Sequence, residues 1–199
     1  MIACVVAWAL SLIAGLGGLV AYKGREGATS SPPQLLPVSF ASTNNARPTL
    51  LLFVHPKCSC TTATVSELAR TIASTNDDGE LLRPDIVVVA ATWGDRPDAW
   101  CRTSMVESLL NLPRSRLVID RDAAITHAMD IKTSGHVLFY DEQGALLFSG
   151  GITPARGHEG PNTGESELVE LIRGDRTRHK DTPTYGCALV QEACELRCH

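Results

Sequence analysis

The pattern of apolar and polar positions divides the chain into an apolar first segment and a later domain of alternating strands and helices. Residues 2–22 carry no charged side chain, and about 20 apolar residues are enough to cross a bilayer as a helix. From residue 49 onward, short apolar runs alternate with stretches whose apolar positions recur at helical spacing. The pattern predicts a transmembrane anchor over 1–23, a flexible tether over 24–48, a domain over 49–174 and a cysteine-bearing extension over 175–199.

The predicted domain begins with parallel crossovers and ends with an antiparallel hairpin. The runs at 50–54 and 85–92 are continuous and apolar, as in strands buried on both faces. Residues 136–150 have the pattern of a hairpin around the turn Asp141-Glu142-Gln143-Gly144. This order predicts an α/β fold with a central mixed sheet flanked by helices. The expected strands are 50–54, 85–92, 116–120, 136–140 and 145–150, with a short edge strand within 34–40, and the expected helices are 61–75, 97–110, 123–129 and 165–173.

The charge balance excludes one large class of partners. The formal net charge is -4, with acidic and basic residues mixed along the chain. Neither a basic face nor a glycine loop of the phosphate-binding kind occurs, so we expect no nucleic-acid partner.

The apolar first segment has two interpretations. A cleaved signal peptide would have a basic start, a shorter apolar run and a small-x-small cleavage site. Here the start is uncharged and the run is long, which favours a retained anchor with Cys4 as a small hydrophobe in or beside lipid. Lys23 and Arg25 follow the segment, and the positive-inside rule would place that end in the cytoplasm.

Two of the seven cysteines, Cys58 and Cys60, lie where the first strand of the domain meets its first helix. A thiol at the first turn of a helix faces unpaired backbone N–H groups and the positive end of the helix dipole, which lowers its pKa. The thiolate is both the nucleophile in disulfide exchange and a ligand for soft metals. The turn HPKCSCTT is polar, with His55 and Lys57 adding donor groups, so inert buried cysteines in a mere interaction domain are the least favoured interpretation.

The segment LLLFVHPKCSCTTATVSELAR resembles the thioredoxin superfamily, in particular its membrane-anchored branch of TlpA-like and ResA-like proteins. DRDAAITHAMDIKTSGHVLFYDEQGALLFSGG is similar to the strand and hairpin that follow in that family. Alignment on Glu67 and Leu68 places Cys58 at the family's attacking cysteine and Thr61 at its second cysteine, with Cys60 between them. A Cys-x-Cys disulfide closes a ring with one residue fewer, and we expect it to be more strained and more oxidising.

The resemblance implies a thioredoxin-like fold on the extracytoplasmic, periplasmic side of a membrane, acting as a thiol-disulfide oxidoreductase on the cysteines of partner proteins. The family's cis-proline is replaced by Ser134-Gly135-His136, and the resemblance places His136 beside Cys58, where an imidazole could assist proton transfer. Cys58 would attack, and Cys60 or Cys187 would resolve the mixed disulfide. This chemistry requires no cofactor.

A weaker similarity to Sco-type copper chaperones supports an alternative, non-catalytic function. These proteins share the anchor, the fold, two cysteines at this turn and a histidine near the hairpin strand. The alternative ligands for copper are Cys58, Cys60, His136 and His158, a soft set suited to that metal, with a copper acceptor as partner. His158 belongs to the glycine-rich loop 150–164, which also carries Arg156 and Glu159 and could fold over the cysteines. The roles of Cys194, Cys198 and His199 stay open between a disulfide, a metal site and a disordered end.

Overall fold

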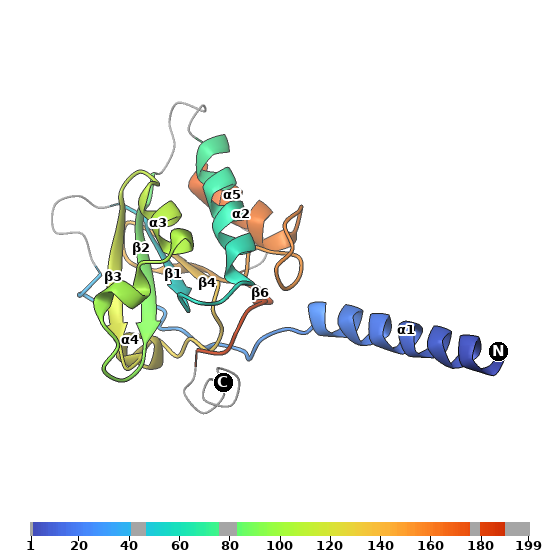
Figure 1. Cartoon of the computed structure of the whole chain (residues 1–199). Helices are drawn as coiled ribbons and strands as arrows, with labels where there is room; N and C mark the ends of the chain where they lie inside the picture. Colours follow the sequence, from blue (N-terminus) through green and yellow to red (C-terminus); the bar gives the residue numbers. More distant parts are fainter. Residues whose placement is uncertain (1, 41–46, 76–82, 176–179, 190–199) are drawn as a thin grey trace.

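The computed structural model describes residues 2–40, 47–75, 83–175 and 180–189 (Figure 1). The terminal Cys194, Cys198 and His199 lie outside the described residues, so the predictions for them remain open.

The domain is built on one six-stranded sheet with the order β3-β2-β1-β4-β5-β6. The strands β1 (Thr49–Val54), β2 (Asp85–Thr92) and β3 (Ser115–Arg121) are parallel to one another. β4 (His136–Tyr140) runs antiparallel to β1, and β5 (Leu146–Gly150) completes the hairpin. β6 (Asp181–Thr182) then pairs parallel with β5. The predicted mixed sheet is confirmed, and the five strands predicted from residue 50 onward correspond to β1 to β5.

Helices cover both faces of this sheet because β1 is apolar on both sides. Its residues Leu50, Leu52 and Val54 belong to a core shared with α2 (Thr61–Ser74), α3 (Ser104–Leu110) and α5 (Thr163–Ile172). Leu51 and Phe53 belong to the core on the opposite face, near α4 (Ala124–Ala128). Figure 1 shows α2, α3 and α5 on one side of the sheet and α4 at the other side. Alternate side chains of β1 therefore pack into two cores, one on each face of the sheet, and the end of the strand is held between these cores.

The predicted continuous helix over 97–110 is wrong. The chain forms a short 3₁₀ helix, η1 (Asp98–Cys101), and then α3 begins after Thr103. Arg102 has a non-helical backbone, and the Thr103 hydroxyl accepts a hydrogen bond from the Val106 N–H at 3.4 Å. Threonine caps a new helix here because its side chain satisfies a backbone donor that a continuous helix would pair with a carbonyl. The expected strand within 34–40 is reduced to an isolated bridge between Leu35 and Ala145.

Both segments that we expected outside the domain lie against it. Phe40 and Leu189 are 5% and 0% exposed and join the core that contains Leu51. The two segments also meet each other, since the Gly27 N–H donates to the Thr184 carbonyl at 2.8 Å. The packed domain therefore extends beyond residue 174, and the described part of the tether follows its surface.

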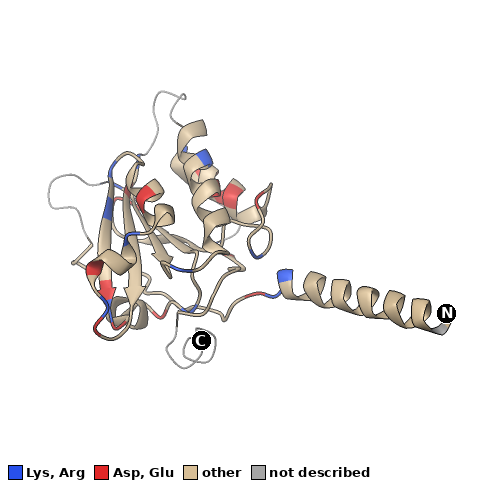
Figure 2. Ribbon diagram, in the orientation of Figure 1, with Lys and Arg blue, Asp and Glu red and all other residues tan. Residues whose placement is uncertain are grey.

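The first helix, α1 (Ile2–Lys23), is exposed along its length and projects from the domain (Figure 1). By length and composition it is able to cross a membrane. Charges of both signs are spread over the domain, whereas Lys23 is the only charged residue of the helix (Figure 2).

Candidate thiol site

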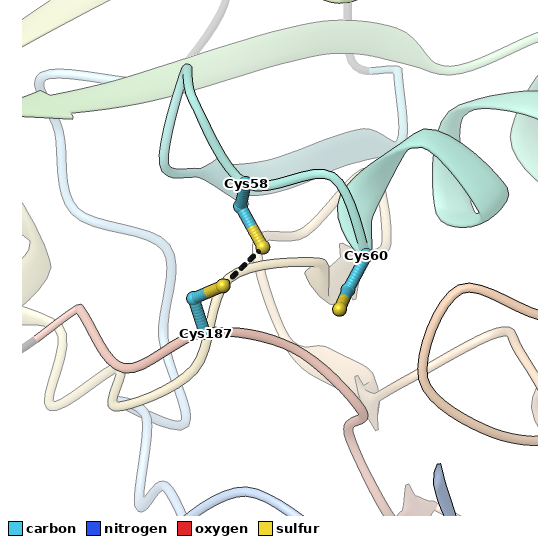
Figure 3. A group of neighbouring side chains, drawn as sticks. All are labelled: Cys58, Cys60 and Cys187. Carbon is cyan, nitrogen blue, oxygen red and sulfur yellow. Dashed lines mark hydrogen bonds between the residues drawn. The ribbon is translucent and has the colours of Figure 1, made fainter. Parts of the chain in front are cut away.

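The turn between β1 and α2 holds Cys58 at the head of the helix. The Cys58 N–H donates to the His55 carbonyl at 2.9 Å, and the Thr61 N–H donates to the Cys58 carbonyl at 3.2 Å. Cys60 is the residue immediately before α2. Cys58 is 3% exposed, and its side chain points toward the C-terminal segment that carries Cys187 (Figure 3).

Three thiols meet at this turn. The sulfurs of Cys58 and Cys187 are 2.6 Å apart, and with the Cys60 sulfur all three lie within 4.8 Å of one another. Figure 3 shows the Cys58 and Cys187 side chains pointing toward each other, with Cys187 carried by the C-terminal segment. The structure thus brings together Cys58, Cys60 and Cys187 from the predicted site residues.

The surroundings make Cys58 the thiolate of the group. A hydrogen bond from the Cys187 thiol is the largest influence and lowers the pKa of Cys58 to about 5, although burial opposes the shift. Hydrogen bonds from Thr61 lower it further. The hydrogen bond to Cys58 raises the pKa of Cys187, and burial together with the Cys58 charge raises that of Cys60. Since the thiolate form of a cysteine is its nucleophilic form, the lowered pKa makes Cys58 the candidate nucleophile among the three thiols.

The buried hydroxyls of Ser134 and Thr61 stabilise the turn that carries Cys58. The Ser134 Oγ accepts a hydrogen bond from the His55 N–H at 2.8 Å and lies 2.7 Å from the Thr61 Oγ1. All peptide bonds are trans in the described part of the chain. The sequence alignment marked Thr61 and Ser134 as two separate departures from the family, but it held no signal that their side chains bind each other.

Next to Ser134, Gly135 allows the loop before β4 to approach α2. Its φ is 89°, and a Cβ there would lie 2.8 Å from the Thr64 Oγ1 in that helix. Its N–H donates to the Phe53 carbonyl at 2.8 Å, so a side chain at this position would push the loop away from α2 and strain this bond to β1.

His136 does not join the thiols as the resemblance implied. Its Nε2 lies 2.9 Å from the Ser149 Oγ, and its Nδ1 lies 2.9 Å from the Thr184 Oγ1. The side chain is 4% exposed, and burial lowers its pKa to about 4. A buried imidazole requires a partner for each ring nitrogen, and the two hydroxyls supply them away from the sulfurs. His136 therefore joins the hairpin to the C-terminal segment, and the three-sulfur group of the described residues does not contain it.

His158 is likewise outside that group. It is exposed, its Nδ1 lies 2.8 Å from the Arg156 carbonyl, and its Nε2 lies 3.2 Å from the Lys23 Nζ. The loop that carries it does approach the thiols, since a Cβ on Gly157 would lie 3.9 Å from the Cys60 Cα. The contribution of this loop is Arg156, whose positive charge opposes the raised pKa values of Cys60 and Cys187.

Arg156 also ties three segments together. Its guanidinium donates to the Arg25 carbonyl at 2.9 Å and to the Gly186 carbonyl. The loop is held in turn by the buried Glu67, whose carboxylate accepts the Gly160 N–H at 2.5 Å. The loop 150–164 therefore approaches the cysteines as expected, but it contributes the charge of Arg156 there and not the His158 ring.

An aromatic wall beside the turn was missed by the sequence analysis. The His55 ring stacks on Trp93 with centroids 5.4 Å apart and meets the edge of Trp100 at 5.7 Å. Its Nδ1 accepts the Lys57 N–H, and burial lowers its pKa, so the ring is neutral. A usable signal existed, because Trp93 follows β2 directly and the carboxyl ends of parallel strands meet at one edge of the sheet.

No protein-family model matches the sequence, and no curated protein matches it either. Among solved structures, the chain is similar to an uncharacterized conserved protein from Geobacillus kaustophilus, with a TM-score of 0.55, 19% identity, and coverage of 83% of this chain and 92% of that one. A hypothetical protein from Sinorhizobium meliloti 1021 matches with a TM-score of 0.50, 16% identity, and coverage of 83% and 93%. A secreted Mycobacterium tuberculosis disulfide oxidoreductase homologous to E. coli DsbE matches with a TM-score of 0.44 and 19% identity. This match covers 65% of this chain and 83% of that one.

The domain has a thioredoxin-like fold. Its strand order and the helices on both faces of the sheet agree with the fold of the family that the sequence resembles, and the cysteine turn lies at the head of α2.

Proposed function

We propose that the protein is a membrane-anchored thiol-disulfide redox protein that acts on cysteines of partner proteins through Cys58, on the extracytoplasmic side. The observation that carries the proposal is the Cys187 sulfur 2.6 Å from a Cys58 thiol whose pKa is lowered to about 5. A thiolate with a second thiol in bonding range is the arrangement that disulfide exchange needs.

The exchange proceeds in two balanced steps. The Cys58 thiolate attacks a disulfide of the partner, forms a Cys58–partner disulfide and releases the partner's other sulfur as a thiolate. The Cys187 thiolate then attacks the Cys58 sulfur, forms the Cys58–Cys187 disulfide and releases the second partner thiolate. The partner disulfide has gained two electrons and the two cysteines have lost them. A dithiol protein resets the pair by the reverse exchange, and no cofactor takes part.

Charge loss at Cys58 prepares the second step. While Cys58 is a thiolate, its hydrogen bond and its charge raise the pKa of Cys187. The mixed disulfide has no such charge, so the main cause of the raised pKa disappears. Arg156 still favours the Cys187 thiolate, which then forms next to the sulfur that it attacks.

The test is a trapping experiment in the full-length protein. Cys187→Ser should accumulate mixed disulfides through Cys58, and Cys60→Ser should accumulate fewer, because the Cys187 sulfur is the closer one. Cys101→Ser is the matched control, since Cys101 is buried in the core that contains Leu50 and lies outside the thiol group. If Cys58 is trapped by no partner in either variant and titrates like an ordinary thiol, the proposed function is wrong.

The anchoring part of the proposal is supported by the length and composition of α1. The last turn of that helix contacts the loop at the thiols, because the Lys23 carbonyl accepts the Arg156 N–H at 3.1 Å. Disulfide chemistry persists in oxidising compartments, which favours the extracytoplasmic side. The protein should resist alkaline extraction from membranes, and an impermeant thiol reagent should label it in intact cells. Release by alkali, or labelling only after lysis, would contradict this part.

A copper-binding function is a second candidate, favoured by the three sulfurs within 4.8 Å of one another. Cys187 would replace His136 and His158 as the third ligand. The redox function is the better supported one, because it accounts for the pairing of Cys187 with Cys58, whereas a copper site would use all three sulfurs alike. Anaerobic titration of the reduced full chain with Cu(I) should show saturable binding that Cys187→Ala removes and His136→Ala retains. No binding would end this candidate.

A further inference from the structure

Residues 184–189, which we name the strap, run antiparallel beside residues 132–134. The Ser134 N–H donates to the Cys187 carbonyl and the Leu189 N–H donates to the Lys132 carbonyl, both at 2.8 Å. Thr133 and Ala188 form the antiparallel bridge between these two bonds. The strap thus lies as an added strand beside the loop that precedes β4, with Cys187 facing Cys58.

The strap fits closely against the domain at Gly186 and at Leu189. A Cβ on Gly186 would lie 1.9 Å from the Ser134 carbonyl oxygen, so only glycine allows this approach. Leu189 is 0% exposed in the core that contains Leu51. The Arg156 guanidinium also donates a hydrogen bond to the Gly186 carbonyl. The strap is therefore seated by shape, by backbone pairing and by one cation.

The same strap blocks the attacking sulfur. Cys58 is 3% exposed, and its sulfur is in contact with that of Cys187. A disulfide on another protein cannot reach Cys58 in this arrangement. A peptide that presents a cysteine to Cys58 would also need the Ser134 N–H and Lys132 carbonyl for the same antiparallel pairing, and these groups are already bonded to the strap.

We propose that the strap is an internal stand-in for a partner peptide, and that the strap and the partner occupy the 132–134 edge in alternation. This inference rests on the proposed redox function. The strap leaves, an extended cysteine-bearing segment of the partner pairs with the edge, and its disulfide is attacked by Cys58. The returning strap takes back the backbone bonds as Cys187 attacks Cys58, so resolution and release of the partner are one event.

The direct test is hydrogen exchange on a trapped complex. The Cys60→Ser/Cys187→Ser full-length protein in detergent is reacted with a short peptide whose single central cysteine is activated as a mixed disulfide with 5-thio-2-nitrobenzoate. Attachment at Cys58 is verified by mass spectrometry. If the peptide replaces the strap, the Leu189 N–H loses its protection in the complex, while the Ser134 N–H stays protected by its new partner.

The two failures are distinguishable. A peptide that attaches to Cys58 while the Leu189 N–H remains protected would overturn the strap proposal and leave the redox function standing. If Cys58 does not react with the activated peptide at all, the redox function fails, and the strap proposal fails with it.

Gly186→Ala tests the same idea by one methyl group. The added Cβ meets the Ser134 carbonyl, so the strap should open. Above pH 9.0, where Cys58 is a thiolate with or without the hydrogen bond from Cys187, the rate of peptide attachment to Cys58 in the otherwise wild-type chain should rise about tenfold. Formation of the Cys58–Cys187 disulfide should become slower. Gly24→Ala is the matched control, because its Cβ would meet only the Val20 carbonyl at 3.8 Å, and it should change neither rate. An attachment rate in Gly186→Ala equal to that of the control would overturn the proposal.

Discussion

The two sulfurs at the centre of the site are held by regions of very different construction. Cys58 follows β1, which has β2 on one side and β4 on the other and whose six residues are all buried. Cys187 lies on the strap, which is joined to residues 132–134 by two backbone bonds and to the rest of the protein by contacts of Thr184, Gly186 and Leu189. In the proposed mechanism the attacking thiol is therefore held at the end of a buried central strand, and the resolving thiol is on a segment at the surface of the domain. Local opening at low free-energy cost is expected of the second region and not of the first.

The largest effect should come from removing either sulfur, and the two removals should differ in kind. Cys58→Ser should lower the exchange rate with a partner disulfide by at least about a thousandfold, because the sulfur that attacks the partner disulfide is removed. Cys187→Ser should retain the first step and lose the second, giving one burst of released partner thiol without turnover. Stopped-flow measurement of the released thiol separates them. Equal loss of the burst in both variants would contradict the assigned roles.

Removal of a buried leucine should distinguish the two regions by stability. Leu52→Ala in β1 should lower the free energy of unfolding by about 2–5 kcal/mol, because the sheet cannot collapse into the cavity. Leu189→Ala should lower it by roughly half as much or less, because the strap can open locally while the sheet stays folded. Both side chains are 0% exposed, which makes the pair matched. Urea unfolding of the full chain in detergent gives the values, and equal losses would show that the strap belongs to the cooperative core.

The dependence of Cys58 on the strap should appear in its titration. The ultraviolet absorbance of its thiolate should appear with a midpoint near pH 5, and the midpoint should move up toward 9.0 in Cys187→Ala, since the hydrogen bond from Cys187 is the largest cause of the lowered pKa. Between pH 5 and 9 the unfolded chain binds more protons at Cys58, so this group's contribution to stability rises with pH in that window. The contribution is lost as pH falls through 5. An unchanged midpoint in the variant would assign the shift to the helix end instead.

The smallest effect on the rate of disulfide formation is expected from the removal of the Arg156 guanidinium. Arg156→Gln removes the cation that favours the Cys187 thiolate and weakens the hold on the Gly186 carbonyl. Closure of the Cys58–Cys187 disulfide should slow by about threefold to tenfold. His158→Ala, an exposed neighbour in the same loop, is the control and should leave the rate unchanged. A similar rate in the two variants would remove Arg156 from the mechanism.

The local features of the molecule were predictable from the sequence, and some of the reasons are visible in single elements. The run at 50–54 is apolar at every position, so it could only be a strand buried on both faces, and the turn after it had to carry Cys58 to the head of a helix. The helix expected at 97–110 was wrong because Thr103 competes for a backbone donor, a choice between two local hydrogen bonds that apolar spacing does not encode.

The sequence by itself determined the alternation of strands and helices, the apolar first helix and the place of Cys58, because each depends on neighbours a few residues apart. Only the tertiary structure decided which side chains reach that cysteine. His136 was expected there and is held instead by Ser149 and Thr184, whereas Cys187, one of two thiols proposed to resolve, comes within 2.6 Å. The physical reason is that these contacts join residues 13, 48 and 129 positions apart, and that the last of them depends on a backbone approach at Gly186 that no local pattern records.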